Sequence, residues 1–185
     1  MPLLTLIGYR GTGKTTVARL LAEQLDTSWI DADVVLEKRL GRTIADLVRD
    51  EGESVFRDAE AKVLADLLAT ERGVLATGGG VVLREPNRVL LRERGRPVVW
   101  LDAPIAVIQR RLASDPATVS SRPGLAGGSP LAEVETAVRI REPLYRACAD
   151  WEVDTGATSP ADVAAEIAAW LGRAGATFDR EGAAP

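Results

Sequence analysis

Short apolar runs alternate along this chain with longer segments in which apolar residues recur at helical spacing. We predict strands at 3–7, 28–31, 74–77, 97–101 and 151–154. We predict helices at 16–25, 34–40, 43–50 and 54–68, then from Pro104, from Leu131 with an interruption near Pro143, and from Pro160 to Leu171. Strands that alternate with amphipathic helices form parallel sheets covered on both faces. The pattern therefore predicts a three-layer α/β fold around a five-stranded parallel sheet.

Two segments depart from this alternation. Residues 114–130 contain three prolines and three glycines, and loops of this length inside a compact domain are commonly functional. We expect this segment to be a lid over a binding site. Residues 172–185 are rich in alanine and glycine, and we expect them to be disordered. The chain is therefore predicted to fold as one domain, residues 1–171.

Composition narrows the possible chemistry. A net charge of −4, a pI near 5.1 and an aromatic content of only 4% argue against nucleic-acid binding. The absence of histidine excludes histidine zinc sites and a Ser-His-Asp triad. Cys148 is the one cysteine, so no internal disulfide can form. No apolar run is long enough to cross a membrane and no signal sequence precedes the first strand, so we expect a cytoplasmic protein without membrane partners.

A glycine-rich motif lies between the first predicted strand and the first predicted helix. Residues Gly8 to Thr15 match the pattern G-x-x-x-x-G-K-[ST]. At such a turn, backbone N–H groups converge on phosphate oxygens at a helix N-terminus. Lys14 supplies positive charge for the β- and γ-phosphates, and the Thr15 hydroxyl can bind Mg²⁺. The motif predicts binding of a nucleoside triphosphate, and we expect the loop to fold without the Lys14 side chain.

Two aspartates stand at the end of the second predicted strand. Asp31 and Asp33 can point the same way, because side chains two apart in a strand share a face. One carboxylate could hold the water shell of Mg²⁺, while the other orients an acceptor hydroxyl and takes its proton. Asp33 could also cap the helix that follows. Asp102, at the end of the strand at 97–101, competes with Asp31 for the metal.

A second set of candidates suits an acidic acceptor molecule. Gly78 to Gly80 follow the third predicted strand and allow another group to approach the backbone closely. Arg57 and Arg141 each look like ordinary exposed helix arginines, but as a pair they could grip a carboxylate with a fork geometry that lysine lacks. Arg122 lies in the loop at 114–130, where it could reach the γ-phosphate when the loop closes.

In this order and spacing the motifs resemble those of the shikimate kinases. The resemblance covers the chain from Leu3 to about Leu171 and is carried by residues 8–16, 31–33, 37–39, 52–57, 76–80, 122–123 and 141–145. It implies a fold like that of nucleoside monophosphate kinases, with strand order 2-3-1-4-5. It also implies transfer of the γ-phosphoryl group of ATP to the 3-hydroxyl of shikimate, a step of aromatic amino-acid biosynthesis. We expect the protein to be a monomer.

The resemblance also implies a role for each matched residue. The catalytic residues would be Lys14, Asp33 and Arg122. The ATP-binding residues would be Gly11, Thr12, Gly13, Lys14, Thr15, Thr16, Arg111 and Arg122. The shikimate-binding residues would be Asp33, Arg57, Gly78, Gly79, Gly80 and Arg141. Thr15 would bind Mg²⁺ directly and Asp31 would bind it through water. Arg110 competes with Arg111 for adenine, and residues 155–160 lack the basic residue that several family members have near adenine.

Two other functions stay open. Another small-molecule kinase of the same fold, of the gluconate or nucleotide type, would keep Lys14 and Thr15 but should lack the arginine pair. A non-catalytic nucleotide-binding regulator would have no need of Lys14, Asp33 and Arg122 together.

Overall fold

The computed structural model describes residues 1–114 and 130–181. Arg122 and the predicted lid lie outside the described residues, apart from the two ends of that segment. The strands are β1 (Leu4–Ile7), β2 (Trp29–Asp31), β3 (Val74–Ala76), β4 (Val98–Asp102) and β5 (Trp151–Asp154). They form one parallel sheet in the order β2-β3-β1-β4-β5. The predicted fold class and strand order are therefore confirmed.

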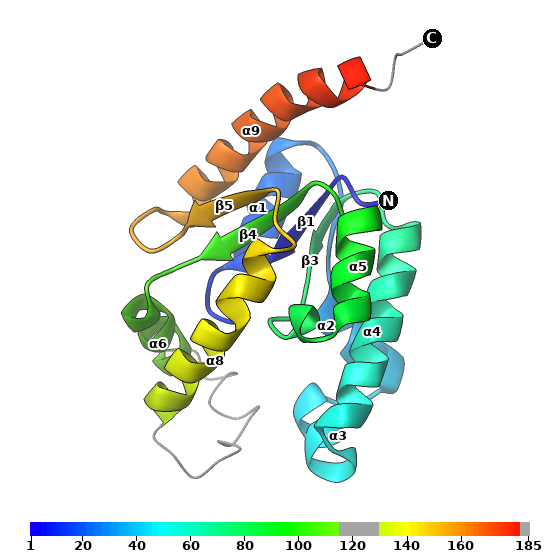
Figure 1. Ribbon diagram of the computed structural model, residues 1–185, viewed down its shortest axis with the longest axis vertical. Coiled ribbons are helices and arrows are strands. Elements are labelled where there is room, and N and C mark those ends of the chain that lie inside the picture. Colours follow the sequence, from blue (N-terminus) through cyan, green and yellow to red (C-terminus); the bar gives the residue numbers. More distant parts are fainter. Residues whose placement is uncertain (115–129, 182–185) are drawn as a thin grey trace.

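Helices cover both faces of this sheet (Figure 1). They are α1 (Lys14–Gln24), α2 (Ala32–Leu40), α3 (Ile44–Glu51), α4 (Glu53–Thr70), α5 (Glu85–Arg94), α6 (Ile105–Ala113), α8 (Pro130–Arg146) and α9 (Pro160–Glu181), with a short 3-10 helix η1 (Val81–Leu83). Of these described helices, α1 and α9 pack together against one face of the sheet (Figure 1). Helices α2, α4 and α5 and the end of α8 pack against the other.

The core follows from alternation along the strands. Val98 and Trp100 of β4 belong to the cluster under α4, α5 and α8, whereas Val99 and Leu101 belong to the cluster under α1 and α9. A strand buried on both faces needs apolar residues at successive positions, which is why β4 reads as a continuous apolar run. Trp100 also stacks on Tyr145 of α8, with ring centroids 5.8 Å apart. This stack attaches α8 to the sheet.

Several elements differ from the sequence prediction. Helix α2 begins at Ala32, so Asp31 rather than Asp33 caps it, and Asp33 lies in its first turn. Helix α5 was not predicted, although Pro86 in its first turn is a typical start signal. Helix α8 runs through Pro143 without interruption, and the turn after it is closed by the Ala147 N–H, which donates to the Pro143 carbonyl.

The last helix is longer than predicted, while the expected disorder of residues 172–185 stays a prediction. Helix α9 continues to Glu181, beyond the predicted end at Leu171. Alanine has the highest helix propensity, so an alanine-rich tail that extends a packed helix can remain helical. Residues 182–185 lie outside the described part of the chain. Within that described part, no helix combines the length and apolar character needed to cross a bilayer.

Candidate functional site

The glycine-rich motif forms the turn between β1 and α1, as predicted. Helix α1 begins at Lys14 with Gly13 as its N-cap, and no side chain accepts a hydrogen bond from its first N–H groups. These N–H groups and the helix dipole form a site for an anion. The Thr12 hydroxyl donates to the Tyr9 carbonyl at 2.8 Å and so closes the turn from within.

Lys14 is held by the loop itself. Its Nζ donates to the carbonyls of Gly8 and Tyr9, each at 2.9 Å, and the side chain is buried. Burial lowers the pKa of Lys14 to about 8, although the nearby carboxylates of Asp33 and Asp31 favour its charged form. The loop therefore has contacts with the Lys14 side chain that the sequence did not indicate, because two loop carbonyls accept hydrogen bonds from the ammonium group. That the loop folds without this side chain stays a prediction.

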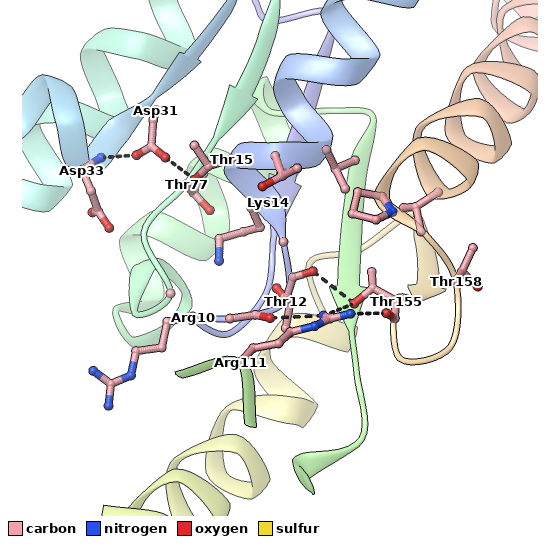
Figure 2. A pocket seen from close by; sticks show the side chains of 17 residues that line it. Arg10, Thr12, Lys14, Thr15, Asp31, Asp33, Thr77, Arg111, Thr155 and Thr158 are labelled. Atoms are coloured by element: carbon pink, nitrogen blue, oxygen red, sulfur yellow. Dashed lines mark hydrogen bonds between the residues drawn. The ribbon is translucent and has the colours of Figure 1, made fainter. Parts of the chain in front are cut away.

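Asp31 joins the loop to α2. Its Oδ2 accepts a hydrogen bond of 2.6 Å from the Thr15 hydroxyl, and its Oδ1 accepts one of 2.9 Å from the Asp33 N–H (Figure 2). This hydrogen bond caps α2, so the helix begins at Ala32 and Asp33 lies in its first turn. The contact between Thr15 and Asp31 brings together the two residues predicted to hold the metal.

The donors at this point suit Mg²⁺. A hydroxyl and a carboxylate are hard oxygen ligands, and Mg²⁺ commonly takes only one or two protein groups and completes its shell with water and phosphate. Among the described residues, no group of three or more Asp, Glu, Cys or His side chains could form a closed metal site. Asp102 is not among the residues that line the cavities, and burial raises its pKa. Of the two aspartates, Asp31 therefore has the geometry for the metal.

Two cavities open beside the loop and share part of their walls. The larger has a volume of about 690 Å³ and is lined by the glycine-rich loop and the start of α1, with Thr77, Arg111, Thr155, Thr158, Pro160 and Val163. The smaller, of about 380 Å³, is lined by residues of α2, α3 and α4, with Gly79, Gly80 and Arg141. Arg10, Thr15, Asp31, Asp33 and Gly79 line both. A group bound in one cavity can therefore reach a group bound in the other.

Arg111 lies in the wall of the larger cavity, whereas Arg110 is exposed and does not line it. Arg111 donates to the Gly11 carbonyl at 3.2 Å and to the Thr155 hydroxyl and carbonyl at 3.0 and 2.6 Å (Figure 2). These bonds connect α6 to the loop and to the segment after β5. Sequence reasoning placed residues 155–160 near adenine but assigned no role to the Thr155 and Thr158 side chains, although their place just after β5, at the carboxyl edge of the sheet, could have indicated them.

Arg57 is buried, contrary to the exposed helix arginine that its position alone suggested. It forms ion pairs with Glu60 at 2.8 Å and Glu53 at 2.9 Å. Burial opposes its charge, but the two glutamates raise the pKa of Arg57 above its ordinary value. A Cβ on Gly80 would lie 2.1 Å from the Arg57 guanidinium, so a larger residue there would have to displace that group. The Oε1 atom of Glu60 is buried and has no hydrogen-bond partner. Glu60 also lines the smaller cavity, so it is a further candidate for binding a molecule there.

Arg141 reaches the same cavity from α8. It donates to the Gly79 carbonyl at 3.2 Å, and its guanidinium carbon lies 5.2 Å from the centre of the Tyr9 ring. The Tyr145 hydroxyl donates to the same carbonyl. Gly78 does not line either cavity, but its backbone lies against Asp33, because a Cβ there would meet the Asp33 carboxylate at 2.7 Å. The structure thus gathers Asp33, Arg57, Gly79, Gly80 and Arg141 around one cavity and places Gly78 behind it.

Comparisons with known proteins give a consistent result. The family model described as shikimate kinase matches residues 10–172. The shikimate kinase of Oleidesulfovibrio alaskensis is 47% identical over 154 residues, which cover 83% of this chain and 88% of that protein. The shikimate kinase of Rhodopirellula baltica is 42% identical over 164 residues, covering 89% of this chain and 87% of that protein.

Solved structures agree with these matches. A shikimate kinase from Acinetobacter baumannii in complex with shikimate superposes with a TM-score of 0.82 at 37% identity, and the match covers 89% of each chain. A gluconokinase from Sinorhizobium meliloti gives a TM-score of 0.58 at 19% identity, over 96% of this chain and 95% of that one. At that identity the second match shows a shared fold alone.

Proposed function

Because the chain belongs to the shikimate kinase family, we propose that it transfers the γ-phosphoryl group of ATP to the 3-hydroxyl of shikimate. The products are shikimate 3-phosphate and ADP, and the reaction is a step of aromatic amino-acid biosynthesis. The enzyme is an ATP-dependent kinase of a small molecule. The observation that carries the choice of acceptor is the smaller cavity, in which two arginines and an aspartate adjoin the glycine-rich loop.

The two cavities divide the substrates between them. ATP occupies the larger one, with its phosphates on the N–H groups of residues 11–16 and its base between Arg111 and the segment from Thr155 to Pro160. Shikimate occupies the smaller one, with its carboxylate on the guanidinium groups of Arg57 and Arg141. The fixed guanidinium of Arg57, already paired with two glutamates, orients that carboxylate without having to be ordered first.

Phosphoryl transfer then needs alignment and charge neutralisation more than covalent chemistry. The bond from the γ-phosphorus to the bridging oxygen breaks, its electron pair leaves with ADP, and a bond forms to the acceptor oxygen. Asp33 lies in the wall common to both cavities, where it can hold the acceptor hydroxyl and take its proton. Lys14 supplies positive charge at the phosphate side, and Arg122 would add to it from the predicted lid.

Thr15 and Asp31 would hold Mg²⁺, Thr15 directly and Asp31 through water. When bound, the ion neutralises charge on the β- and γ-phosphates. We also propose that the enzyme works as a monomer in the cytoplasm.

A coupled assay of ADP release tests this function directly. We expect turnover with shikimate and Mg²⁺, and background rates with gluconate, with nucleoside monophosphates or with no acceptor. Turnover with gluconate or a nucleotide and none with shikimate would favour the related kinases. Binding of ATP without turnover of any acceptor would indicate a regulator instead.

Replacing Arg57 with lysine should weaken acceptor binding selectively. An ammonium group keeps the charge but cannot make a two-pronged contact, so we expect the KM for shikimate to rise about 10-fold or more. The KM for ATP should change little, because Arg57 lines only the smaller cavity. Arg84→Lys is the matched control, since Arg84, at the start of α5, pairs with Asp58 of α4 outside both cavities. An unchanged KM for shikimate in Arg57→Lys would remove Arg57 from the carboxylate site.

Nucleotide binding should take up protons near pH 8. The pKa of Lys14 is about 8 in the unliganded protein, and an anionic triphosphate beside the ammonium group should raise it. Calorimetry at pH 8 in buffers of different ionisation enthalpy should therefore detect uptake of about half a proton, falling to none near pH 6.5. Affinity for ATP should fall as the pH rises through 8. Lys14→Arg should abolish the uptake, because arginine stays charged throughout, and uptake that persisted in this variant would have to come from another group.

A further inference from the structure

Arg10 lies at the boundary between the two cavities. It occupies a variable position of the glycine-rich motif, between Tyr9 and Gly11, and it lines both the larger and the smaller cavity. Figure 2 shows its guanidinium group on the side of the loop away from Lys14 and Thr12. The positive charge of Lys14 therefore lies on one side of the loop, and that of Arg10 lies on the other.

The hydrogen bonding of Arg10 is incomplete. Its Nε is buried and has no hydrogen-bond partner, and within the described part of the chain it forms no ion pair with a carboxylate. A buried N–H group without a partner is uncommon in native proteins, since leaving it unpaired is costly. Such a group at a cavity wall indicates a missing acceptor.

A second cation faces the same aromatic ring. The guanidinium carbon of Arg10 lies 6.0 Å from the centre of the Tyr9 ring, and that of Arg141 lies 5.2 Å from it. Within the described residues no ion pair joins either arginine to a carboxylate, although Asp31 and Asp33 also line the cavity boundary. Arg141 is assigned to the acceptor carboxylate, so the guanidinium group of Arg10 is a further positive charge beside that site, at the boundary with the larger cavity.

We propose that Arg10 is a further catalytic residue, which binds the phosphoryl group on the acceptor side as it moves from ATP to the hydroxyl. This inference rests on the proposed function. The group that crosses the boundary carries its charge on three oxygens throughout the transfer. Arg10 donates to one of them in the transition state and to the phosphate of the product afterwards. Arg57 and Arg141 remain with the carboxylate, which does not change during the reaction.

The variant Arg10→Met tests the proposal, because methionine keeps an unbranched stem and removes the donors. We expect kcat to fall about 10-fold and the Kd for shikimate 3-phosphate to rise about 10-fold or more. The Kd for shikimate, which lacks the phosphate, should stay within about twofold. Arg139→Met removes the same charge from an exposed position on α8 and should leave all three values unchanged.

The outcomes separate the proposal from its alternatives. If the Kd for shikimate rises as much as that for the product, Arg10 belongs to the carboxylate site or to the frame of the loop. If kcat and the product Kd both stay near the parent values while the parent phosphorylates shikimate, the proposal is wrong and the proposed function stands. If the parent does not phosphorylate shikimate, the proposed function itself fails.

A measurement on the unaltered enzyme keeps the proposal testable even if Arg10→Met does not fold. The ¹⁵N-correlated NMR signal of the Arg10 Nε–H can be assigned by its loss in Arg10→Lys. We expect it to shift when shikimate 3-phosphate saturates the enzyme and to stay in place with shikimate alone. A signal that stays in place with the product would overturn the proposal.

Discussion

Replacing Lys14 with methionine should lower kcat about 100-fold or more, because a positive charge is lost where the γ-phosphate develops charge in the transition state. Methionine fills a similar volume, so the packing at the start of α1 is retained. The ammonium group has its Nζ only 2.9 Å from two loop carbonyls, and it lies at the larger cavity. Steady-state kinetics with saturating shikimate measures the loss.

The effect on folding should be small, since two contributions oppose each other. The variant loses two hydrogen bonds to the carbonyls of Gly8 and Tyr9, but it also loses a charge whose burial is unfavourable, as the lowered pKa of Lys14 shows. Lys62→Met, at an exposed position on α4, controls for the loss of a lysine. Near-normal kcat in Lys14→Met with an unchanged thermal melt would exclude Lys14 from the chemistry.

The same charge makes the unliganded fold depend on pH. Its pKa is about 8 in the folded protein against an ordinary value of 10.5, so between these values the unfolded chain binds more protons at this position. The contribution of Lys14 to the free energy of unfolding therefore increases as the pH rises through that window. Below pH 8 the buried ammonium group weighs against folding, which is consistent with a residue retained for its function.

The sequence predicted those features that short-range patterns determine. The five strands and their parallel arrangement follow from apolar runs separated by helical segments, and the position of Lys14 and Thr15 follows from one contiguous motif. Helix boundaries were less predictable, because the hydrogen bond that the Asp33 N–H donates to the Asp31 carboxylate decides where α2 begins. The sequence from Asp31 to Asp33 is compatible both with the end of a strand and with the start of a helix, and only the hydrogen bond decides between them.

Contacts between distant segments could not be predicted from local patterns. Arg57 looks like a surface residue in the sequence, and only the packing of α4 buries it beside Glu60. Arg111 and Arg110 are indistinguishable until the fold brings Arg111 against Thr155. Arg10 was overlooked because the motif allows any residue there, whereas its unpaired Nε is visible only in the structure.

Asp33→Asn should lower kcat by about 100-fold or more while leaving the Kd for ATP within about twofold, since general base catalysis contributes ~10²–10⁴. The amide keeps the shape of the side chain but cannot take the acceptor proton. The Asp33 carboxylate packs closely against Gly78, where a Cβ would meet it at 2.7 Å. Because asparagine has the same shape, it should keep this contact, and the smaller cavity should keep its form. The N–H of residue 33 still donates to Asp31, so α2 should start at the same place.

The matched control is Asp46→Asn, which removes a carboxylate from the first turn of α3. Both substitutions remove a negative charge that favours a helix N-terminus, but Asp46 lies outside the two cavities, so its kcat should stay near that of the parent. The ATP affinity of each variant is measured by calorimetric titration of the protein with ATP in the presence of Mg²⁺. If ATP binding collapsed in Asp33→Asn, Asp33 would belong to the metal site, and the division of labour between it and Asp31 would be wrong. A fall in kcat with ATP affinity retained would instead assign proton transfer to Asp33 and the metal to Asp31, as the hydrogen bond between Thr15 and Asp31 favours.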